Sequence, residues 1–189
     1  NPELASNKAQ HQQTLELIDS VLAKLLSTYK PAAADPTQSS KRTPVNIAQK
    51  RAQMEPGEIK VLVVDDDTLI SSMMKVLLES YGVTNVDIAQ DGLQAISMLY
   101  DANPVYDLVL CDWNMPIKNG LDVHNAMRAA ERYMDTCFML VTAVTEAKQI
   151  RAAIEEGVDD YIVKPIEEQK IIKKFARHFP KFIDSPKSR

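Results

Sequence analysis

The sequence has no long apolar run and no excess of positive charge. None of its apolar runs approaches the roughly 18 residues that a transmembrane helix needs, and its first residues lack the pattern of a signal peptide. Lys and Arg together number 22 against 26 Asp and Glu, so the net charge is -4. Because proteins that bind nucleic acids normally carry a basic surface, we expect a cytoplasmic protein that binds neither nucleic acid nor membrane.

Cysteine is also scarce. The only two cysteines, Cys111 and Cys137, lie in apolar stretches typical of buried strands. If these strands are parallel neighbours, Cys111 lies near the end of one and Cys137 near the start of the other. They are then farther apart than the roughly 7 Å that a disulfide can span. We therefore predict two buried, reduced thiols, as is usual in cytosolic proteins.

The chain is long enough for one domain plus an extension, since a domain usually has about 100–200 residues. Residues 1–30 are expected to form an N-terminal helical extension, with an amphipathic helix over 14–29. Residues 31–58 contain four prolines and a polar cluster, and we interpret them as a linker. Regular patterning covers 59–180, and 181–189 form a polar tail.

The predicted helix over 14–29 has an apolar stripe that needs a cover, because an isolated helix near 15 residues is marginal in water. The cover can be a second copy of the chain, the surface of the following domain, or a region upstream of Asn1. The width of the stripe favours self-association, so we predict a homodimer through residues 14–29. The stripe consists of Leu15, Ile18, Leu22, Leu25, Leu26 and Tyr29.

Strands and helices alternate from Ile59 onward. Short apolar runs predict strands, and apolar residues at steps of three and four predict helices. This alternation is typical of a doubly wound α/β fold with helices on both faces of a parallel sheet. We predict the flavodoxin-like strand order 2-1-3-4-5. The predicted strands cover 60–64, 86–89, 107–111, 137–141 and 160–163, and the helices cover 68–81, 92–101, 121–132, 146–156 and 167–179.

Polar residues follow four of these apolar strands: Asp65, Asp66 and Asp67 follow the first, and Asp112, Thr142 and Lys164 end three later ones. Since ligands of open α/β sheets bind at the carboxyl ends of the strands, we expect a site there. Three converging carboxylates repel one another, and oxygen ligands from short acids suit Mg²⁺. With a lysine and a hydroxyl beside them, they form an arrangement that stabilises phosphoryl oxygens while a carboxylate attacks.

Four short motifs in the sequence are specific enough to indicate a family. They are Val63-Val64-Asp65-Asp66, Asp112-Trp113-Asn114-Met115-Pro116 with Asn119-Gly120, Val141-Thr142-Ala143, and Tyr161-Ile162-Val163-Lys164-Pro165. Over about 59–179 the chain resembles the receiver domain of two-component response regulators, and the second motif looks most like the single-domain chemotaxis type.

The resemblance implies a phosphorelay protein rather than an enzyme, one that assists its own aspartyl phosphorylation and dephosphorylation. Its phosphodonor would be a sensor histidine kinase or a histidine phosphotransfer protein, and it would act on a downstream protein target. The implied roles are Asp112 as nucleophile, Asp65, Asp66, Asp112 and the Asn114 carbonyl as the Mg²⁺ site, Lys164 and Thr142 as phosphoryl-binding groups, Thr142 and Tyr161 as switch residues, and Lys164-Pro165 as a cis peptide.

Two alternatives stay open. The run Asp65-Asp66-Asp67-Thr68 also fits the opening of haloacid-dehalogenase-type phosphatases, with Asp65 as nucleophile and Asp67 as the acid. That family needs a further acidic strand end after its lysine, and the residues after Lys164 do not supply one. The other alternative is a receiver module cut from a larger hybrid kinase or regulator, because the sequence begins at Asn1 instead of a methionine.

Overall fold

The computed structural model describes residues 44–143 and 153–182. The predicted helix over 14–29 and most of the predicted helix over 146–156 lie outside these ranges. None of the helices in the described ranges has the length and apolar character of a membrane span.

A five-stranded parallel sheet forms the centre of the domain, in the order β2-β1-β3-β4-β5. This confirms the predicted fold and strand order. The strands are β1 (Lys60–Val64), β2 (Asn85–Ala89), β3 (Leu108–Asp112), β4 (Cys137–Thr142) and β5 (Asp160–Val163). Both faces of β1, β3 and β4 are almost fully buried, as expected of parallel strands with helices on either side.

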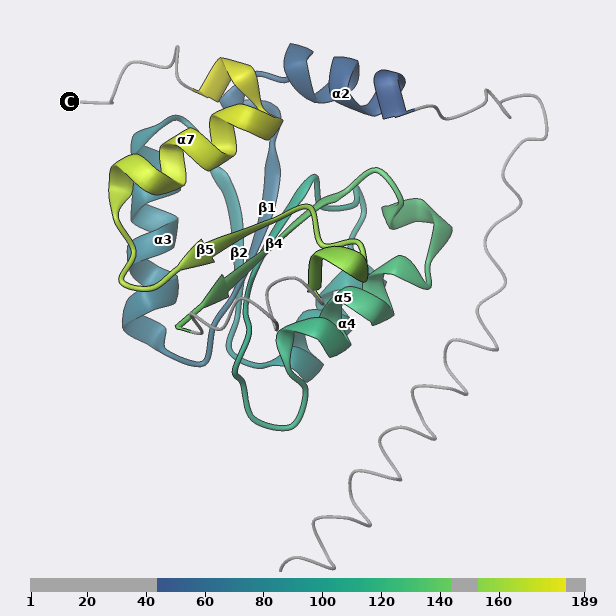
Figure 1. Ribbon diagram of the computed structural model, residues 1–189, viewed down its shortest axis with the longest axis vertical. Helices are drawn as coiled ribbons and strands as arrows, with labels where there is room; N and C mark the ends of the chain where they lie inside the picture. Colours follow the sequence, from purple (N-terminus) through teal and green to yellow (C-terminus); the bar gives the residue numbers. More distant parts are fainter. Residues whose placement is uncertain (1–43, 144–152, 183–189) are drawn as a thin grey trace, which may run out of the picture. The chain divides into compact units, whose positions relative to one another are not determined.

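Helices cover both faces of the sheet (Figure 1). On one face, α3 (Thr68–Ser80) and α7 (Glu168–His178) enclose a core that includes Leu78 and Phe175. On the other, α4 (Gly92–Asp101) and α5 (Gly120–Arg128) enclose a second core that includes Leu99 and Val123. A short turn, η3 (Glu131–Tyr133), continues the chain after α5, where the sequence predicted an unbroken helix to 132.

The two cysteines are free and buried, as predicted. β3 and β4 are parallel neighbours in which Leu108 pairs with Cys137 and Cys111 pairs with Leu140. Cys111 therefore lies three residues along the sheet from Cys137. Because each residue of a strand advances about 3.3 Å, the two sulfur atoms are too far apart to bond.

Two segments that flank the predicted domain contain a helix or a turn in the structure. The expected linker over 31–58 contains a ten-residue helix, α2 (Pro44–Gln53), and a turn, η2 (Pro56–Glu58). Arg51 of α2 donates to the Asp135 carbonyl at 2.7 Å and lies over the Phe179 ring. At the other end, the expected tail begins with a turn, η4 (Pro180–Phe182), whose Phe182 is buried against Tyr81. Both segments thus pack on the domain.

Candidate phosphoryl-transfer site

Three predicted site residues meet at the carboxyl edge of the sheet. Lys164, just after β5, places its Nζ 2.7 Å from Asp112 Oδ1 and 2.9 Å from Asp65 Oδ2. Asp65 follows β1 and Asp112 ends β3, so one ammonium joins side chains from three strand ends. Both carboxylates are buried, and Lys164 is partly buried. One positive charge therefore serves two acidic side chains.

Backbone hydrogen bonds fix the position of Asp112. The Trp113 amide donates to the Val141 carbonyl at 2.8 Å, which carries the pairing of β3 with β4 one residue beyond the strand. The Asn114 amide donates to Asp112 Oδ2 at 2.9 Å. With Lys164 on Oδ1, both oxygens of the Asp112 carboxylate are bound. The orientation of the Asp112 side chain is thus fixed by contacts to both of its oxygens.

The electrostatics of this cluster disfavour the ionised form of Asp112. Burial raises the pKa of Asp112 above its ordinary value, and Asp65 raises it further, while the hydrogen bond from Lys164 opposes both effects. Burial alone would lower the pKa of Lys164, but its hydrogen bonds to Asp112 and Asp65 outweigh this and raise it. The lysine is therefore held as an ammonium, and the Asp65 and Asp112 side chains share its single positive charge.

The other two acids after β1 have different surroundings. Asp66 is exposed at the same edge. Asp67 caps α3, because its Oδ1 accepts from the Leu69 amide at 2.8 Å. Asp67 is therefore engaged as a helix cap and not as the catalytic acid that the phosphatase alternative requires.

The remaining predicted residues lie on neighbouring strands. Thr142 ends β4 and is fully buried, and its carbonyl accepts from the Lys164 amide at 2.8 Å. Tyr161 in β5 is partly buried, and Asn114 is exposed after β3. Lys164 and Pro165 are joined by a cis peptide, which confirms that expectation.

The donors at this edge are oxygen atoms, which fit Mg²⁺ better than they fit softer metals. Within the described ranges, no three His, Cys, Asp or Glu side chains are grouped so as to hold a metal ion. Two carboxylates with one shared lysine still meet the usual requirement of Mg²⁺, which takes one or two carboxylates and retains several waters. The donor chemistry therefore fits the ion.

Residues 61–176, more than half of the chain, match the family described as response regulator receiver domain. The chain belongs to this family. The haloacid-dehalogenase alternative is not supported, because the match covers all four motifs and the cluster at the carboxyl edge.

Known proteins similar to this receiver include chemotaxis proteins. It is 38% identical over 121 residues to the chemotaxis protein CheY of Pseudomonas aeruginosa, covering 64% of this chain and 96% of the relative. It is 36% identical over 121 residues to CheY-3 of Vibrio cholerae, covering 64% and 92%. Among solved structures, CheY4 of Vibrio cholerae matches with a TM-score of 0.59 and 28% identity, covering 64% of this chain and 98% of that one.

Gly120 belongs to the second motif, but the sequence alone does not explain why a glycine is needed there. A Cβ atom at Gly120 would lie 2.6 Å from the Asp112 carbonyl oxygen and 2.6 Å from Leu140 Cδ2. Real Cβ atoms do not approach backbone oxygen so closely. Gly120 therefore lets α5 begin directly against the backbone that carries Asp112.

We expect Gly120→Ala to displace Asp112 and to slow its phosphorylation. Overpacking of this kind typically costs about 1–3 kcal/mol, which urea unfolding will measure, and the labelling rate with acetyl phosphate will fall with it. Gly57→Ala is the matched control, since the nearest atom to its added Cβ lies at 3.7 Å, in ordinary contact. Equal labelling rates and stabilities in the two variants would contradict this account.

Proposed function

We propose that Asp112 accepts a phosphoryl group from a phosphohistidine. An Asp112 oxygen attacks phosphorus, the bond between phosphorus and the histidine nitrogen breaks, and the imidazole leaves with its electron pair. The observation that carries the proposal is the position of Lys164, whose Nζ contacts the Asp112 and Asp65 carboxylates at 2.7 and 2.9 Å. A phosphoryl group joined to Asp112 comes within reach of the same ammonium.

A Mg²⁺ ion fits this proposal, and Asp65, Asp66, Asp112 and the Asn114 carbonyl would hold it. The ion would supply positive charge to the oxygens of the phosphoryl group and of the attacking carboxylate. A solved structure of the receiver domain of the sensor histidine kinase PA1611 of Pseudomonas aeruginosa is described with magnesium coordinated in its active-site cleft. That structure is 23% identical to this chain, with a TM-score of 0.57. The match covers 65% of this chain and 98% of that one, and it supports the fold.

Lys164 has to exchange partners during the transfer. It now contacts Oδ1 of the Asp112 carboxylate, the group that would become bonded to phosphorus. As the phosphoryl group arrives, the ammonium would shift to a phosphoryl oxygen, and the Thr142 hydroxyl would bind another. Phosphorylation adds about 1.5 to 2 negative charges. These charges would attract the Lys164 ammonium and the Thr142 hydroxyl, and Tyr161 would turn inward once Thr142 has moved.

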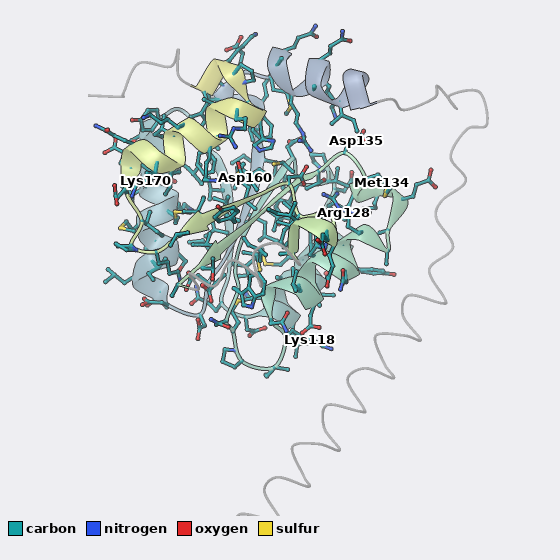
Figure 2. The ribbon with its side chains drawn as sticks, in the orientation of Figure 1. Lys118, Arg128, Met134, Asp135, Asp160 and Lys170 are labelled. Carbon is teal, nitrogen blue, oxygen red and sulfur yellow. The ribbon has the colours of Figure 1, made fainter. Side chains whose placement is uncertain are left out.

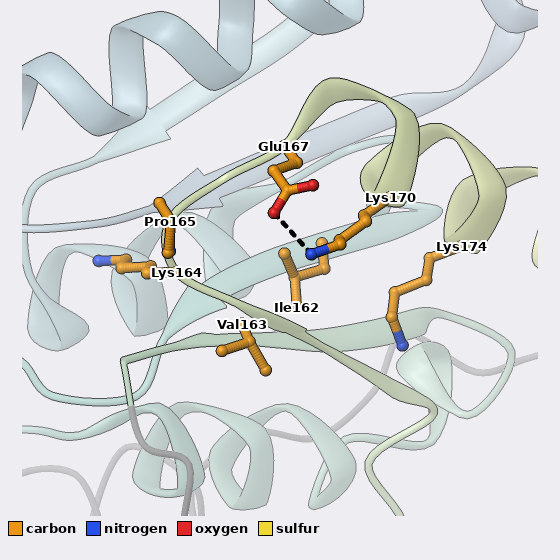
Figure 3. A pocket seen from close by; sticks show the side chains of 7 residues that line it. All are labelled: Ile162, Val163, Lys164, Pro165, Glu167, Lys170 and Lys174. Carbon is orange, nitrogen blue, oxygen red and sulfur yellow. Dashed lines mark hydrogen bonds and ion pairs between the residues drawn. The ribbon is translucent and has the colours of Figure 1, made fainter.

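The partner surface would then be the face formed by β5 and α7. A cavity of about 230 Å³ opens there, lined by Ile162, Val163, Lys164, Pro165, Glu167, Lys170 and Lys174. Lys164, which contacts Asp112, also lines this cavity. Its side chain extends away from Lys170 and Lys174 (Figure 3). A movement of Lys164 therefore alters the surface that a downstream protein would contact.

The test is stoichiometry. We expect the protein incubated with acetyl phosphate and Mg²⁺ to gain one phosphoryl group per chain, measured by intact-mass spectrometry. A phosphatase would instead release phosphate from many substrate molecules without a stable mass change. We propose a sensor histidine kinase or a histidine phosphotransfer protein as the physiological donor, acting in the cytoplasm, where buried free thiols such as those of Cys111 and Cys137 are usual.

The N-terminal stripe supports a separate proposal, a homodimer through residues 14–29, which lie outside the described residues. Because α2 packs on the domain, the comparison needs a shortened chain that starts at Thr43 and keeps α2. At micromolar concentration we expect the full chain to sediment as a dimer and the shortened chain as a monomer. A monomeric full chain rejects the dimer, and a dimeric shortened chain moves the interface into the receiver.

A further inference from the structure

Lys174 of α7 contacts the predicted switch tyrosine. Its Nζ lies 4.4 Å from the centroid of the Tyr161 ring, within the roughly 6 Å range of a cation–π interaction. The same nitrogen lies 2.5 Å from Asp160 Oδ1. The side chain of Lys174 is 24% exposed. The side chain is therefore only partly exposed, and its ammonium is held against the ring.

Asp160 determines where this ammonium lies. The Asp160 carboxylate is buried beneath α7 (Figure 2), and its Oδ1 also accepts from the Tyr161 amide at 2.8 Å. Its Oδ2 lies 3.3 Å from Arg177 Nη1 and 3.5 Å from His178 Nε2. One carboxylate thus binds both the backbone of Tyr161 and the cation over its ring, so the tyrosine and Lys174 are fixed relative to each other.

We propose that Lys174 is a positioning residue that holds Tyr161 in the position seen here and so opposes the switch. The proposal rests on the proposed function, in which Tyr161 turns inward when Asp112 is phosphorylated. A Tyr161 ring that turns inward leaves the ammonium, and the cation–π interaction is lost. A contact made in only one of two states shifts their equilibrium by its own free energy. Lys174 therefore favours the unphosphorylated arrangement.

Beryllofluoride, which binds an aspartate carboxylate as a phosphoryl mimic, measures this equilibrium. Removal of the cation by Lys174→Met should raise the apparent affinity for beryllofluoride about two- to fivefold, the range that a partly exposed cation–π interaction allows. Lys174→Arg should keep the native affinity, because a guanidinium also stacks on an aromatic ring. Lys173→Met is the matched control, since Lys173 is exposed on the same helix.

The titration is followed by the fluorescence of Trp113, the only tryptophan, which directly follows Asp112. Each variant is first checked by thermal unfolding. If Lys174→Met has no cooperative transition, Lys174→Gln takes its place. Lys174 also binds Asp160, so a structural role has to be separated from the role on the ring. Tyr161→Leu removes the ring and provides the required background.

In the Tyr161→Leu background, Lys174→Met should leave the beryllofluoride affinity unchanged, whereas in the Tyr161→Phe background, which keeps the ring, the gain should persist. The same gain in all three backgrounds would show that Lys174 acts through Asp160 and would overturn the proposal, as would no gain in the native background. If the native protein binds no beryllofluoride in the presence of Mg²⁺, the proposed function itself fails. These results are distinguishable because the native titration precedes the comparison of variants.

Discussion

Asp112→Asn should abolish labelling by acetyl phosphate, lowering the rate by about 10³-fold or more, as removal of a nucleophile does elsewhere. The amide oxygen is a poor nucleophile and carries no charge for Lys164 to balance. The same loss should follow when a chelator removes Mg²⁺, because the approaching phosphoryl group then meets the Asp65 and Asp112 carboxylates with only one ammonium beside them. Intact-mass spectrometry after a fixed incubation measures both effects.

Asp67→Asn is the control for this substitution. Asn is as good an N-cap as Asp, so the bond from the Leu69 amide is retained and labelling should continue. Asp65→Asn should slow labelling without stopping it, since the nucleophile is still present. If Asp112→Asn labels fully and Asp65→Asn does not, Asp65 is the nucleophile and the proposed function is wrong.

The second large effect is on stability. Asp160→Asn should destabilise the fold by about 3 kcal/mol, the lower end of the cost of removing one partner from a buried ion pair, because Lys174 is partly solvated. Urea unfolding at pH 7 measures this loss. Asp101→Asn, the same change at an exposed position of α4, is the control and should change little.

The same carboxylate predicts a dependence on pH. Burial alone would raise the pKa of Asp160, but the nearby His178 side chain and the hydrogen bonds from Lys174 and the Tyr161 amide outweigh it and leave the pKa well below its usual range. In the unfolded chain an aspartate has a pKa of about 3.9. As the pH falls below that value, the unfolded chain binds a proton before the folded one does, so stability declines until the pH passes the lowered folded pKa.

The difference in stability between the native protein and Asp160→Asn should therefore be full at pH 7 and shrink below about pH 4. Unfolding experiments at a series of pH values test this. A difference that is independent of pH would mean that the variant loses packing or geometry and not a charge interaction.

The sequence predicted the sheet and the meeting of Asp65, Asp112 and Lys164 because both follow from a periodic rule. Apolar runs of strand length mark parallel strands, and parallel strands bring their carboxyl ends to one edge. The roles of these residues in phosphoryl transfer, and those of Asp66, Asn114, Thr142 and Tyr161, stay predictions. What the sequence revealed is where these groups lie.

The features that sequence reasoning missed depend on single tertiary contacts. Residues 44–53 have no strong apolar stripe, and α2 is joined to the domain by the Arg51 guanidinium and by Met54, which packs against the core. Phe182 is one aromatic residue in a polar stretch, yet it stacks on Tyr81 with the ring centroids 5.2 Å apart. Neither contact produces a periodic pattern in the sequence, so it could not be predicted from one. The close approach at Gly120 and the contact of Lys174 with Tyr161 are of the same kind.

The place where α2 joins the domain separates two tasks. Arg51 contacts Asp135, just before β4, and lies 3.7 Å from Asp159, just before β5, so α2 is joined at the amino ends of the strands. Asp112 and Lys164 lie at the carboxyl ends. A substitution in α2 that changes how this helix packs therefore acts at the edge of the sheet opposite to Asp112 and Lys164. The amino-terminal edge of the sheet can thus be remodelled through α2 while the Asp65, Asp112 and Lys164 cluster stays as it is.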